Sequence, residues 1–410
     1  MSGQQAINRE HVFGAQNYAP LPVVLSHGRG AHVFDVDGHR YIDMMSAYSA
    51  ASFGHLHPRL VKAMRDQLER LDIVSRAFHS DNLGGFCQEL AQFAGLDSCL
   101  VMNTGAEAVE TAIKAARRYA YDELAIPADK AEIIVAYGNF HGRTTTIVGF
   151  SDDPNSKRGF GPFAPGFASV PFGDADAIEL AINRCTAAVL VEPIQGEGGV
   201  IVPPEGYLAN LRRICDRHGI LLLFDEVQSG FGRTGRNFCF QHEDAVPDGL
   251  IVGKALGGGL MPVSAFIARR ALMDVFTPGS HGSTFGGNPL AAAVGRAAIA
   301  LMQEEQLAER SRALGEVLLD ALHRIRHPAI IALRGKGLWA GIELDPAQAK
   351  AKEVCLAMMR RGVLAKETHE SVLRLAPPLV IEERDMLQAV SVLSEALDEV
   401  AVVRPSRYAG

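Results

Sequence analysis

The sequence predicts an α/β protein with a large domain built on a mostly parallel sheet and a smaller α/β domain at the C-terminal end. The first observation is a series of short, nearly continuous apolar runs that alternate with helical patterns from about residue 98. Such runs are typical of strands buried on both faces between helices. The second is the length of 410 residues, which is too long for one small core. We expect an N-terminal segment (1–45), a large domain (46–290) and a small domain (291–410).

Composition and charge narrow the class of protein. A hydrophobic content of 48% and a charged content of 21% are those of an ordinary globular enzyme. The net charge of −7 provides no basic field for nucleic acid, and no apolar run has the length of a membrane span. The first residues show no signal peptide, and the six cysteines are scattered without a CxxC pair. We therefore expect a cytoplasmic protein with reduced thiols that binds neither nucleic acid nor membrane.

The N-terminal segment is predicted to be irregular at first. Residues 1–30 are expected to form a loop-like lead-in, because Pro20 and Pro22 favour an extended chain lying on another part of the protein. Residues 33–43 have the pattern of a hairpin with Asp37-Gly38 at its turn. Pro58 is expected to open a helix that runs to about Leu71.

The large and small domains are predicted to have different element patterns. A long helical stretch over about 290–325 follows Asn288-Pro289 and leads into the small domain, and residues 404–410 look like an exposed tail. A helix is expected to start at residues 104–107, where Thr104 precedes Gly105 and Ala106. Strands are expected at 99–102, 133–136, 187–191, 220–224, 250–252 and 263–267 in the large domain, and at 330–333, 338–344 and 373–375 in the small one.

Polar residues follow five consecutive strands of the large domain at the point where each strand ends. In open parallel sheets, ligands bind outside the carboxyl ends of the strands. Five strand ends that all carry chemically useful side chains therefore predict one shared site. The segments are 103–106, 139–143, 192–199, 225–228 and Lys254.

Lys254 is the most informative of these residues. Its amine would be desolvated beside a sheet core, which suits it to forming a Schiff base with a carbonyl group. Taken alone it could equally be a solvated lysine beyond a strand. Asp225 could pair with a core arginine, or it could keep a heterocyclic nitrogen protonated. Phe140 could belong to the core or stack on a ring, and the helix start at Gly105 is suited to binding a phosphate.

Together these features predict pyridoxal 5′-phosphate as the cofactor. A phosphate site, a carboxylate for a ring nitrogen, a stacking aromatic residue and a Schiff-base lysine are what this cofactor requires. Competing motifs are absent from the sequence, which has no nucleoside-triphosphate loop, no dinucleotide-binding glycine motif and no H-E-x-x-H zinc motif. We expect no metal.

From Asn17 to about Arg384, the chain resembles the class III aminotransferases, a pyridoxal-phosphate family of fold type I. The resemblance implies a seven-stranded type of sheet in the large domain, and an N-terminal segment that packs on the active site and the small domain. The motifs that carry it are residues 17–22 (Asn-Tyr-Ala-Pro-Leu-Pro), 139–143, 159–162, 191–197, 224–228, 281–289, 364–369 and 374–381.

The resemblance implies a role for each residue of the cofactor site. Lys254 would bond the cofactor and then move the proton, Asp225 would bind the pyridine nitrogen, and Glu192 would be an acid near the catalytic centre. Thr284 would reach the phosphate held by a neighbouring subunit, which implies a homodimer with active sites at the interface. The remaining cofactor contacts would come from Gly105, Ala106, Phe140, Val227 and Gln228.

The resemblance also implies a ping-pong reaction between L-ornithine and 2-oxoglutarate that yields glutamate 5-semialdehyde and glutamate. Arg374 would bind the α-carboxylate of glutamate, and Glu197 would pair with Arg374 when ornithine is bound. Arg143 is expected at the distal carboxylate of either substrate. Tyr18 and Tyr48 would select ornithine by satisfying its free α-amine.

Two alternatives remain open on the sequence. Acetylornithine or another ω-amino acid, such as 4-aminobutyrate, could be the amino donor, since the Gly-Glu-Gly-Gly run at 196–199 and His141 also suit those enzymes. A cofactor-binding regulator without turnover is the other alternative, although no helix-turn-helix segment is found and both Lys254 and Asp225 are present. The ornithine reaction would belong to arginine breakdown or proline synthesis.

Overall fold

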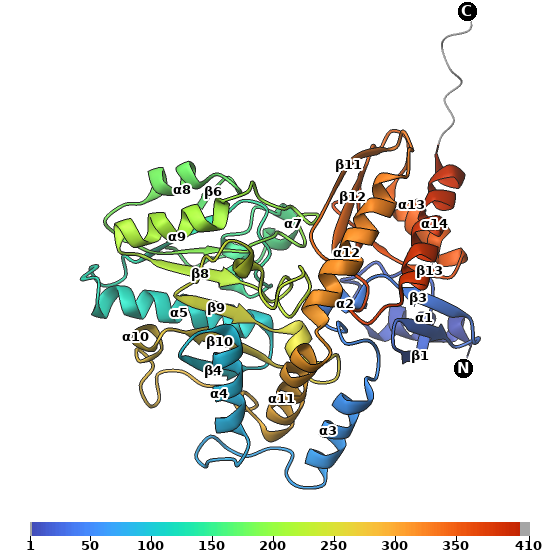
Figure 1. Cartoon of the computed structure of the whole chain (residues 1–410). Helices are drawn as coiled ribbons and strands as arrows, with labels where there is room; N and C mark the ends of the chain where they lie inside the picture. Colours follow the sequence, from blue (N-terminus) through green and yellow to red (C-terminus); the bar gives the residue numbers. More distant parts are fainter. Residues whose placement is uncertain (1, 402–410) are drawn as a thin grey trace, which may run out of the picture.

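The large domain is built on a seven-stranded sheet, seen near the centre of Figure 1. The computed structural model describes residues 2–401, so the predicted tail at 404–410 lies outside the described residues. The strand order is β4-β10-β9-β8-β7-β5-β6, and only β10 runs against its neighbours. The mostly parallel sheet is thereby confirmed. The strands are β4 (Ser98–Met102), β5 (Glu132–Ala136), β6 (Phe167–Val170), β7 (Thr186–Val191), β8 (Leu221–Asp225), β9 (Gly249–Val252) and β10 (Ser264–Ala268).

Helices cover both faces of this sheet, and alternate strand residues pack against them. In β5, Ile133 and Val135 pack in the cluster that contains α5 (Gly105–Asp122). Ile134 packs in the cluster on the opposite face, with α9 (Tyr207–His218). Because successive side chains of a strand point to opposite faces, a strand buried on both faces must be apolar throughout. This explains the continuous apolar runs.

The C-terminal part forms a separate antiparallel sheet flanked by helices (Figure 1). Its strand order is β11-β12-β15-β14. Buried residues of α12, α13 and α14 cover it and share one cluster with the strands. The elements are β11 (Ile330–Gly335), β12 (Ala340–Leu344), β14 (Lys366–Thr368), β15 (Val372–Leu375), α12 (Leu307–His323), α13 (Ala351–Arg360) and α14 (Glu383–Val400).

The long helical stretch expected over 290–325 is two helices rather than one. α11 (Pro289–Glu304) ends just before Gln306, which has a left-handed φ of +49°, and α12 then starts at Leu307. α11 contacts α3 (Pro58–Leu68) and α4 (Leu83–Ala94), whereas α12 contacts α14 and β11. The break therefore lets one apolar stretch pack against two different sets of elements.

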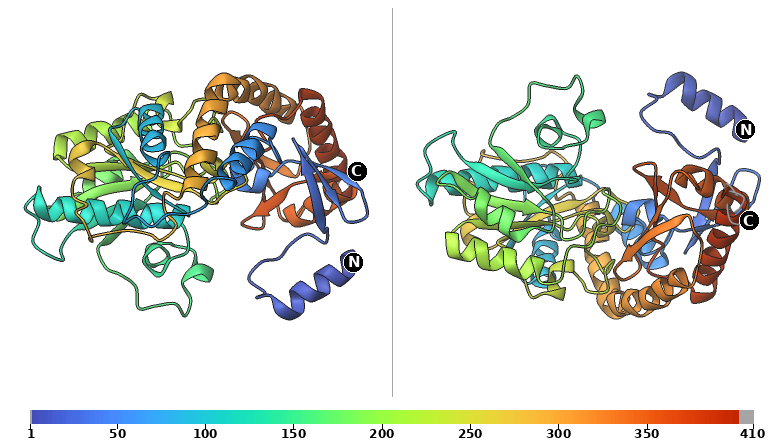
Figure 2. Two further views of the ribbon diagram at one scale, coloured as in Figure 1. Left: turned by 90° about the horizontal axis from the view of Figure 1, so that it is seen from below. Right: turned by 90° about the horizontal axis from the view of Figure 1, so that it is seen from above.

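The N-terminal lead-in is not irregular throughout, in contrast to the prediction from the sequence. Residues Gly3–Phe13 form helix α1, which begins with a capping box between Ser2 and Gln5. None of its residues is buried, and in Figure 2 it lies at the edge of the molecule near the N-terminus. Four strands were also missed: β1 (Leu25–Arg29), which pairs with β2 (His32–Asp35), β6 in the large sheet, β13 (Val363–Leu364) and β14 in the C-terminal sheet.

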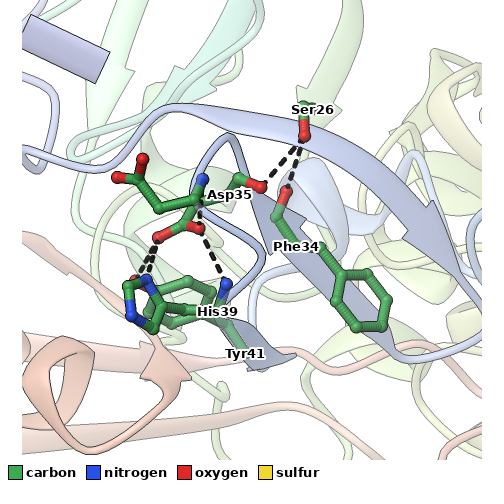
Figure 3. A network of polar contacts seen from close by, with 6 residues as sticks. Ser26, Phe34, Asp35, His39 and Tyr41 are labelled. Atoms are coloured by element: carbon green, nitrogen blue, oxygen red, sulfur yellow. Dashed lines mark hydrogen bonds and ion pairs between the residues drawn. The ribbon is translucent and has the colours of Figure 1, made fainter. Parts of the chain in front are cut away.

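The predicted hairpin is confirmed, with β2 antiparallel to β3 (Arg40–Asp43). Figure 3 shows Asp35 beside the turn of this hairpin, where the carboxylate accepts hydrogen bonds from the Tyr41 hydroxyl, the His39 ring and two backbone N–H groups. Burial disfavours the charged carboxylate, but these hydrogen bonds outweigh it and lower the pKa of Asp35. β3 also pairs with β13 (Val363–Leu364), which joins the N-terminal segment to the C-terminal part.

Helix α3 starts at Pro58 as predicted and ends at Leu68, three residues earlier than expected. The six cysteines are all free. No helix among residues 2–401 is both long and apolar enough to cross a bilayer.

Close packing between α12 and the turn before β12 generates a stability prediction. A Cβ atom at Gly315 would lie 2.3 Å from the carbonyl carbon of Gly337, so Gly315→Ala should lower the free energy of unfolding by about 1–3 kcal/mol. The matched control is Gly84→Ala in α4, where nothing lies within 4 Å of the added atom. That change should raise the free energy of unfolding by about 0.5–1 kcal/mol. Chemical denaturation measures both, and a Gly315→Ala protein as stable as wild type would contradict the packing.

Candidate active site

The five predicted strand ends meet around one cavity of about 180 Å³. Each contributes side chains or backbone from the loop that follows its strand, as expected for a parallel sheet. The cavity adjoins a second of about 360 Å³, with which it shares Phe140, His141 and Gly142. The first is lined by Gly105, Ala106, Phe140, His141, Gly142, Glu192, Ile194, Asp225, Val227, Gln228, Ser229 and Lys254.

The start of α5 presents two backbone donors to this cavity. Thr104 caps the helix by accepting the N–H of Glu107, and the Glu107 carboxylate in turn accepts the N–H groups of Asn103 and Thr104. In the described chain this leaves the N–H groups of Gly105 and Ala106 as first-turn donors without an acceptor. An anion bound there would also be stabilised by the helix dipole.

Lys254 follows β9 directly and has a left-handed φ of +43°. Burial lowers the pKa of its amine, and this effect exceeds the opposing attraction of Glu197, Asp225 and Glu192. A lowered pKa makes more of the neutral, nucleophilic amine available. The geometry therefore suits a lysine that bonds to a carbonyl group in the cavity.

Asp225 is paired with a histidine that the sequence motif alone does not reveal. Its Oδ2 lies 2.7 Å from Nδ1 of His141, and its Oδ1 accepts the N–H of Val227 at 3.0 Å. The His141 side chain is fully buried, which disfavours the imidazolium, yet the hydrogen bond and charge of Asp225 raise the pKa of His141 overall. The two side chains form a buried hydrogen-bonded pair at the cavity wall. The only sequence signal for His141 is its position beside Phe140.

Glu192 is hydrogen-bonded to the backbone of Phe140, an aromatic residue of the cavity. Its carboxylate accepts the N–H of Phe140 at 3.0 Å and that of Gly196 at 3.3 Å. Burial raises the pKa of Glu192 to about 7, with a further contribution from Asp225, while His141 acts in the opposite direction. Glu192 therefore changes protonation close to neutral pH.

The adjoining cavity is bordered by an ion pair at 2.8 Å between the buried Arg374 and the half-buried Glu197. Burial opposes ionisation of Glu197, but the charge and hydrogen bond of Arg374 lower its pKa. The guanidinium of Arg374 also lies 5.1 Å from the ring centroid of Tyr48, which is a cation–π distance. Arg143 lines the same cavity and lies 5.6 Å from the ring centroid of Phe140.

Four of the predicted site residues line neither cavity within the described part of one chain: Arg374 and Tyr48, which lie beside Glu197 and each other, and Tyr18 and Thr284. The side chain of Tyr18 is 76% exposed, although it lies near enough to Tyr48 to add slightly to the effect of burial, which raises the pKa of Tyr48. Thr284 is exposed and lines neither cavity among the described residues. The adjacent Ser283 accepts a hydrogen bond from Asn103 at 2.9 Å, so the Thr284 loop lies beside the start of α5.

Comparisons with known proteins point to one family. The family model described as aminotransferase class III matches residues 13–397. The ornithine aminotransferase of Staphylococcus epidermidis is 53% identical over 385 residues, which are 93% of this chain and 96% of that protein. The solved ornithine aminotransferase of Toxoplasma gondii, with PLP at partial occupancy in its active site, is 41% identical with a TM-score of 0.96, covering 97% of this chain and 95% of that one. The acetylornithine aminotransferase of Elizabethkingia anophelis is 42% identical with a TM-score of 0.89, covering 97% and 100%.

The raised pKa of Glu192 predicts that the ligand-free protein loses stability as the pH rises. Between the ordinary value of 4.5 and about 7, the folded state keeps a proton that the unfolded state has released. Glu192 therefore contributes a decline of about 1.4 kcal/mol in the free energy of unfolding for each pH unit across this window, whereas His242, whose pKa is lowered by burial to about 4, contributes in the opposite direction. Glu192→Gln should remove part of the decline, while Glu226, with a pKa also raised by burial to about 7, retains the rest.

Chemical denaturation of the ligand-free protein at several pH values measures this decline. The control is Glu179→Gln, because Glu179 is only half-buried and its pKa is lowered by His218 and Arg217. That change should leave the slope between pH 4.5 and 7 intact. An unaltered slope in Glu192→Gln would contradict the assignment.

Proposed function

The chain belongs to the class III aminotransferases, and we propose that it transfers the δ-amino group of L-ornithine to 2-oxoglutarate. The products are glutamate and glutamate 5-semialdehyde, which cyclises to pyrroline-5-carboxylate. The observation that carries the proposal is the ion pair between Glu197 and Arg374 with Tyr48 beside it. The ornithine aminotransferases of S. epidermidis and T. gondii, similar over nearly the whole chain, support it.

The cofactor of this family is pyridoxal 5′-phosphate, and the cavity fits it. The free N–H groups of Gly105 and Ala106 would hold the phosphate, Phe140 and Val227 would enclose the ring, and Lys254 would hold it covalently. Gln228 also lines the cavity, where it would lie by the phenolic oxygen. A Cβ atom at Gly105 would lie 3.0 Å from Val227, so glycine permits the close approach of the helix start. When bound, the cofactor supplies an electron sink for removal of a proton from the substrate.

Three residues of the chain would perform the chemical work around the cofactor. Lys254, whose pKa is lowered by burial, would accept and return the proton that moves during amino transfer. Asp225, positioned by its contact with His141, would keep the pyridine nitrogen protonated. Glu192 would orient Phe140 through its backbone hydrogen bond.

The Glu197–Arg374 pair explains how one pocket could accept two donors of different shape. Glutamate must present its α-amine, so its α-carboxylate lies near the reacting carbon and would displace Glu197 from Arg374. Ornithine presents its δ-amine and has no carboxylate at that end, so Glu197 would remain paired with Arg374. Arg143 would bind the distal carboxylate in either case. This alternation of substrates is what a ping-pong reaction requires.

Acetylornithine is the second candidate donor. The 42% identical acetylornithine aminotransferase of E. anophelis and the Gly-Glu-Gly-Gly run at 196–199 favour it. We prefer ornithine because Tyr48 and Tyr18 offer hydroxyl groups to a free α-amine. An acetylated ligand would leave these hydroxyl groups without a partner and would therefore bind poorly.

A homodimer and a cytoplasmic location complete the proposal. Thr284 and the neighbouring Phe285, which is 56% exposed, lie on a loop beside the start of α5. From there Thr284 would reach the phosphate held by a second copy, so that each active site would lie at the interface. The free cysteines favour a reducing compartment.

Single-turnover experiments without a keto acid test the donor directly. L-Ornithine should change the visible absorbance of the bound cofactor faster than N-acetyl-L-ornithine or 4-aminobutyrate, because only ornithine satisfies both tyrosines. Lys254→Ala should still bind cofactor but give no turnover, which makes it the control. A faster response to N-acetyl-L-ornithine would refute the ornithine assignment while leaving the family intact.

Replacing Tyr48 tests the selection of substrate. Tyr48→Ile removes both the hydroxyl and the cation–π contact with Arg374, so the ratio of kcat/KM for ornithine to that for N-acetylornithine should fall about tenfold or more. Tyr48→Phe, which keeps the ring, serves as the control and should have the smaller effect. Steady-state kinetics measure the ratio, and an unchanged ratio in Tyr48→Ile would rule out Tyr48 as the selector.

A further inference from the structure

Tyr48 belongs to a strained turn of the backbone. Ser46, Ala47, Tyr48 and Ser49 have consecutive left-handed φ values of 41°, 47°, 59° and 75°, and none of them is glycine (α2 in Figure 1). A left-handed helical conformation costs an L-residue about 1–2 kcal/mol. Such a segment persists only where its surroundings hold it in place. The side chains that hold this turn therefore determine where Tyr48 lies.

The start of the turn is hydrogen-bonded to two side chains of opposite charge. The Asp43 carboxylate accepts the N–H groups of Met45 at 2.8 Å and Ser46 at 2.9 Å. From the other side, Nη2 of Arg233 donates to the hydroxyl groups of Ser46 at 3.1 Å and Ser52 at 3.0 Å. The hydroxyl of Ser52 in turn donates to the carbonyl of Ser49, and that of Ser46 to the carbonyl of Ala376. Arg233 thus contacts the residues that flank Tyr48 on both sides.

The second terminal nitrogen of Arg233 reaches the C-terminal sheet. Nη1 donates to the carbonyl of Leu338, shortly before β12, at 2.9 Å, and to that of Pro377, just after β15, at 2.6 Å. β15 carries Arg374, so one planar guanidinium is bonded both to the turn of Tyr48 and to the segment that directly follows the strand of Arg374.

The charged guanidinium of Arg233 has no contact with water. Its side chain is fully buried, and the four acceptors are neutral carbonyl and hydroxyl oxygens. Burial lowers the pKa of Arg233 to about 9, although Asp43 opposes the shift. A lysine offers one point of charge rather than a planar fork, so it could not serve the same four acceptors.

We propose that Arg233 is a positioning residue for substrate selection, which fixes Tyr48 relative to Arg374 and thereby sets the preference among amino donors. The Tyr48 ring lies 5.1 Å from the Arg374 guanidinium because the turn and the strand are bonded to the same side chain. The identity of the preferred donor rests on the proposed function, whereas the action of Arg233 through Tyr48 does not.

The experiment measures the ratio of kcat/KM for L-ornithine to that for N-acetyl-L-ornithine. In Arg233→Lys the ratio should fall about tenfold, which corresponds to the loss of about one well-made hydrogen bond. Ser52→Ala removes one acceptor at the turn and should lower the ratio about threefold without altering the guanidinium. If Arg233→Lys does not fold, Ser52→Ala carries the test. Cofactor content, read from the visible absorbance, should stay at the wild-type level in both variants.

Ser311→Ala is the matched control for a purely structural effect. Ser311 is also fully buried, donates to the carbonyl of Arg233 at 3.0 Å and accepts the N–H of Leu338 at 3.2 Å, but it does not touch the turn. It should lower the melting temperature and leave the substrate ratio unchanged. A ratio that also stays unchanged in Arg233→Lys and Ser52→Ala, with only the melting temperature lowered, would overturn the proposal.

A double-mutant comparison tests the route through Tyr48. In the Tyr48→Ile background, Arg233→Lys should leave the ratio within about twofold, because the residue through which Arg233 acts has already been removed. Fully additive effects would overturn the proposal. A wild-type protein that prefers N-acetylornithine would refute the ornithine function alone, since the shift caused by Arg233→Lys is measurable whichever donor is preferred.

Discussion

A sheet that is buried on both faces can display polar side chains only at its ends, and this constraint organises the whole molecule. The residues of β7 and β8 are buried from end to end, and alternate ones enter two separate cores. No strand interior can carry a charge without losing hydration. The residues that do chemistry therefore collect in the loops after β4, β5, β7, β8 and β9, and the C-terminal sheet closes over them.

The same constraint explains why the charged side chains of the site occur in pairs of opposite charge. Arg374 is matched by Glu197, whose side chain is 27% exposed, and Asp225 is matched by His141 in a pair that is almost fully buried. Removing one partner of such a buried pair typically costs about 3–5 kcal/mol, because the other charge is left uncompensated. A substrate carboxylate can replace Glu197 only by taking its place beside Arg374. The pair thus acts as an exchangeable contact, whereas Asp225 and His141 form a fixed one.

Elements with local patterns were predictable, and those fixed by distant partners were not. The strands around Lys254 and Asp225 followed from their apolar runs, and the residues lining the cavity followed from the strand ends and the family motifs. β6 is an edge strand with mostly half-buried residues, so its apolar signal was weak. The break at Gln306 interrupts an apolar pattern that suits helix on both sides. The partners of Arg233 lie 105 to 187 residues away, beyond the reach of any local pattern.

The turn that carries Tyr48 is the clearest disagreement between local preference and structure. Nothing in Ser46-Ala-Tyr-Ser49 favours a left-handed backbone, so the conformation must be imposed by Asp43, Arg233 and the C-terminal sheet. Departures of this kind are expected at functional sites, where neighbouring contacts offset local strain. An enzyme that must accept two substrates could do so through a flexible turn at Tyr48. The contacts argue otherwise: the wall formed by Tyr48 is held rigidly, and the adaptability lies in the exchangeable pair of Glu197 and Arg374.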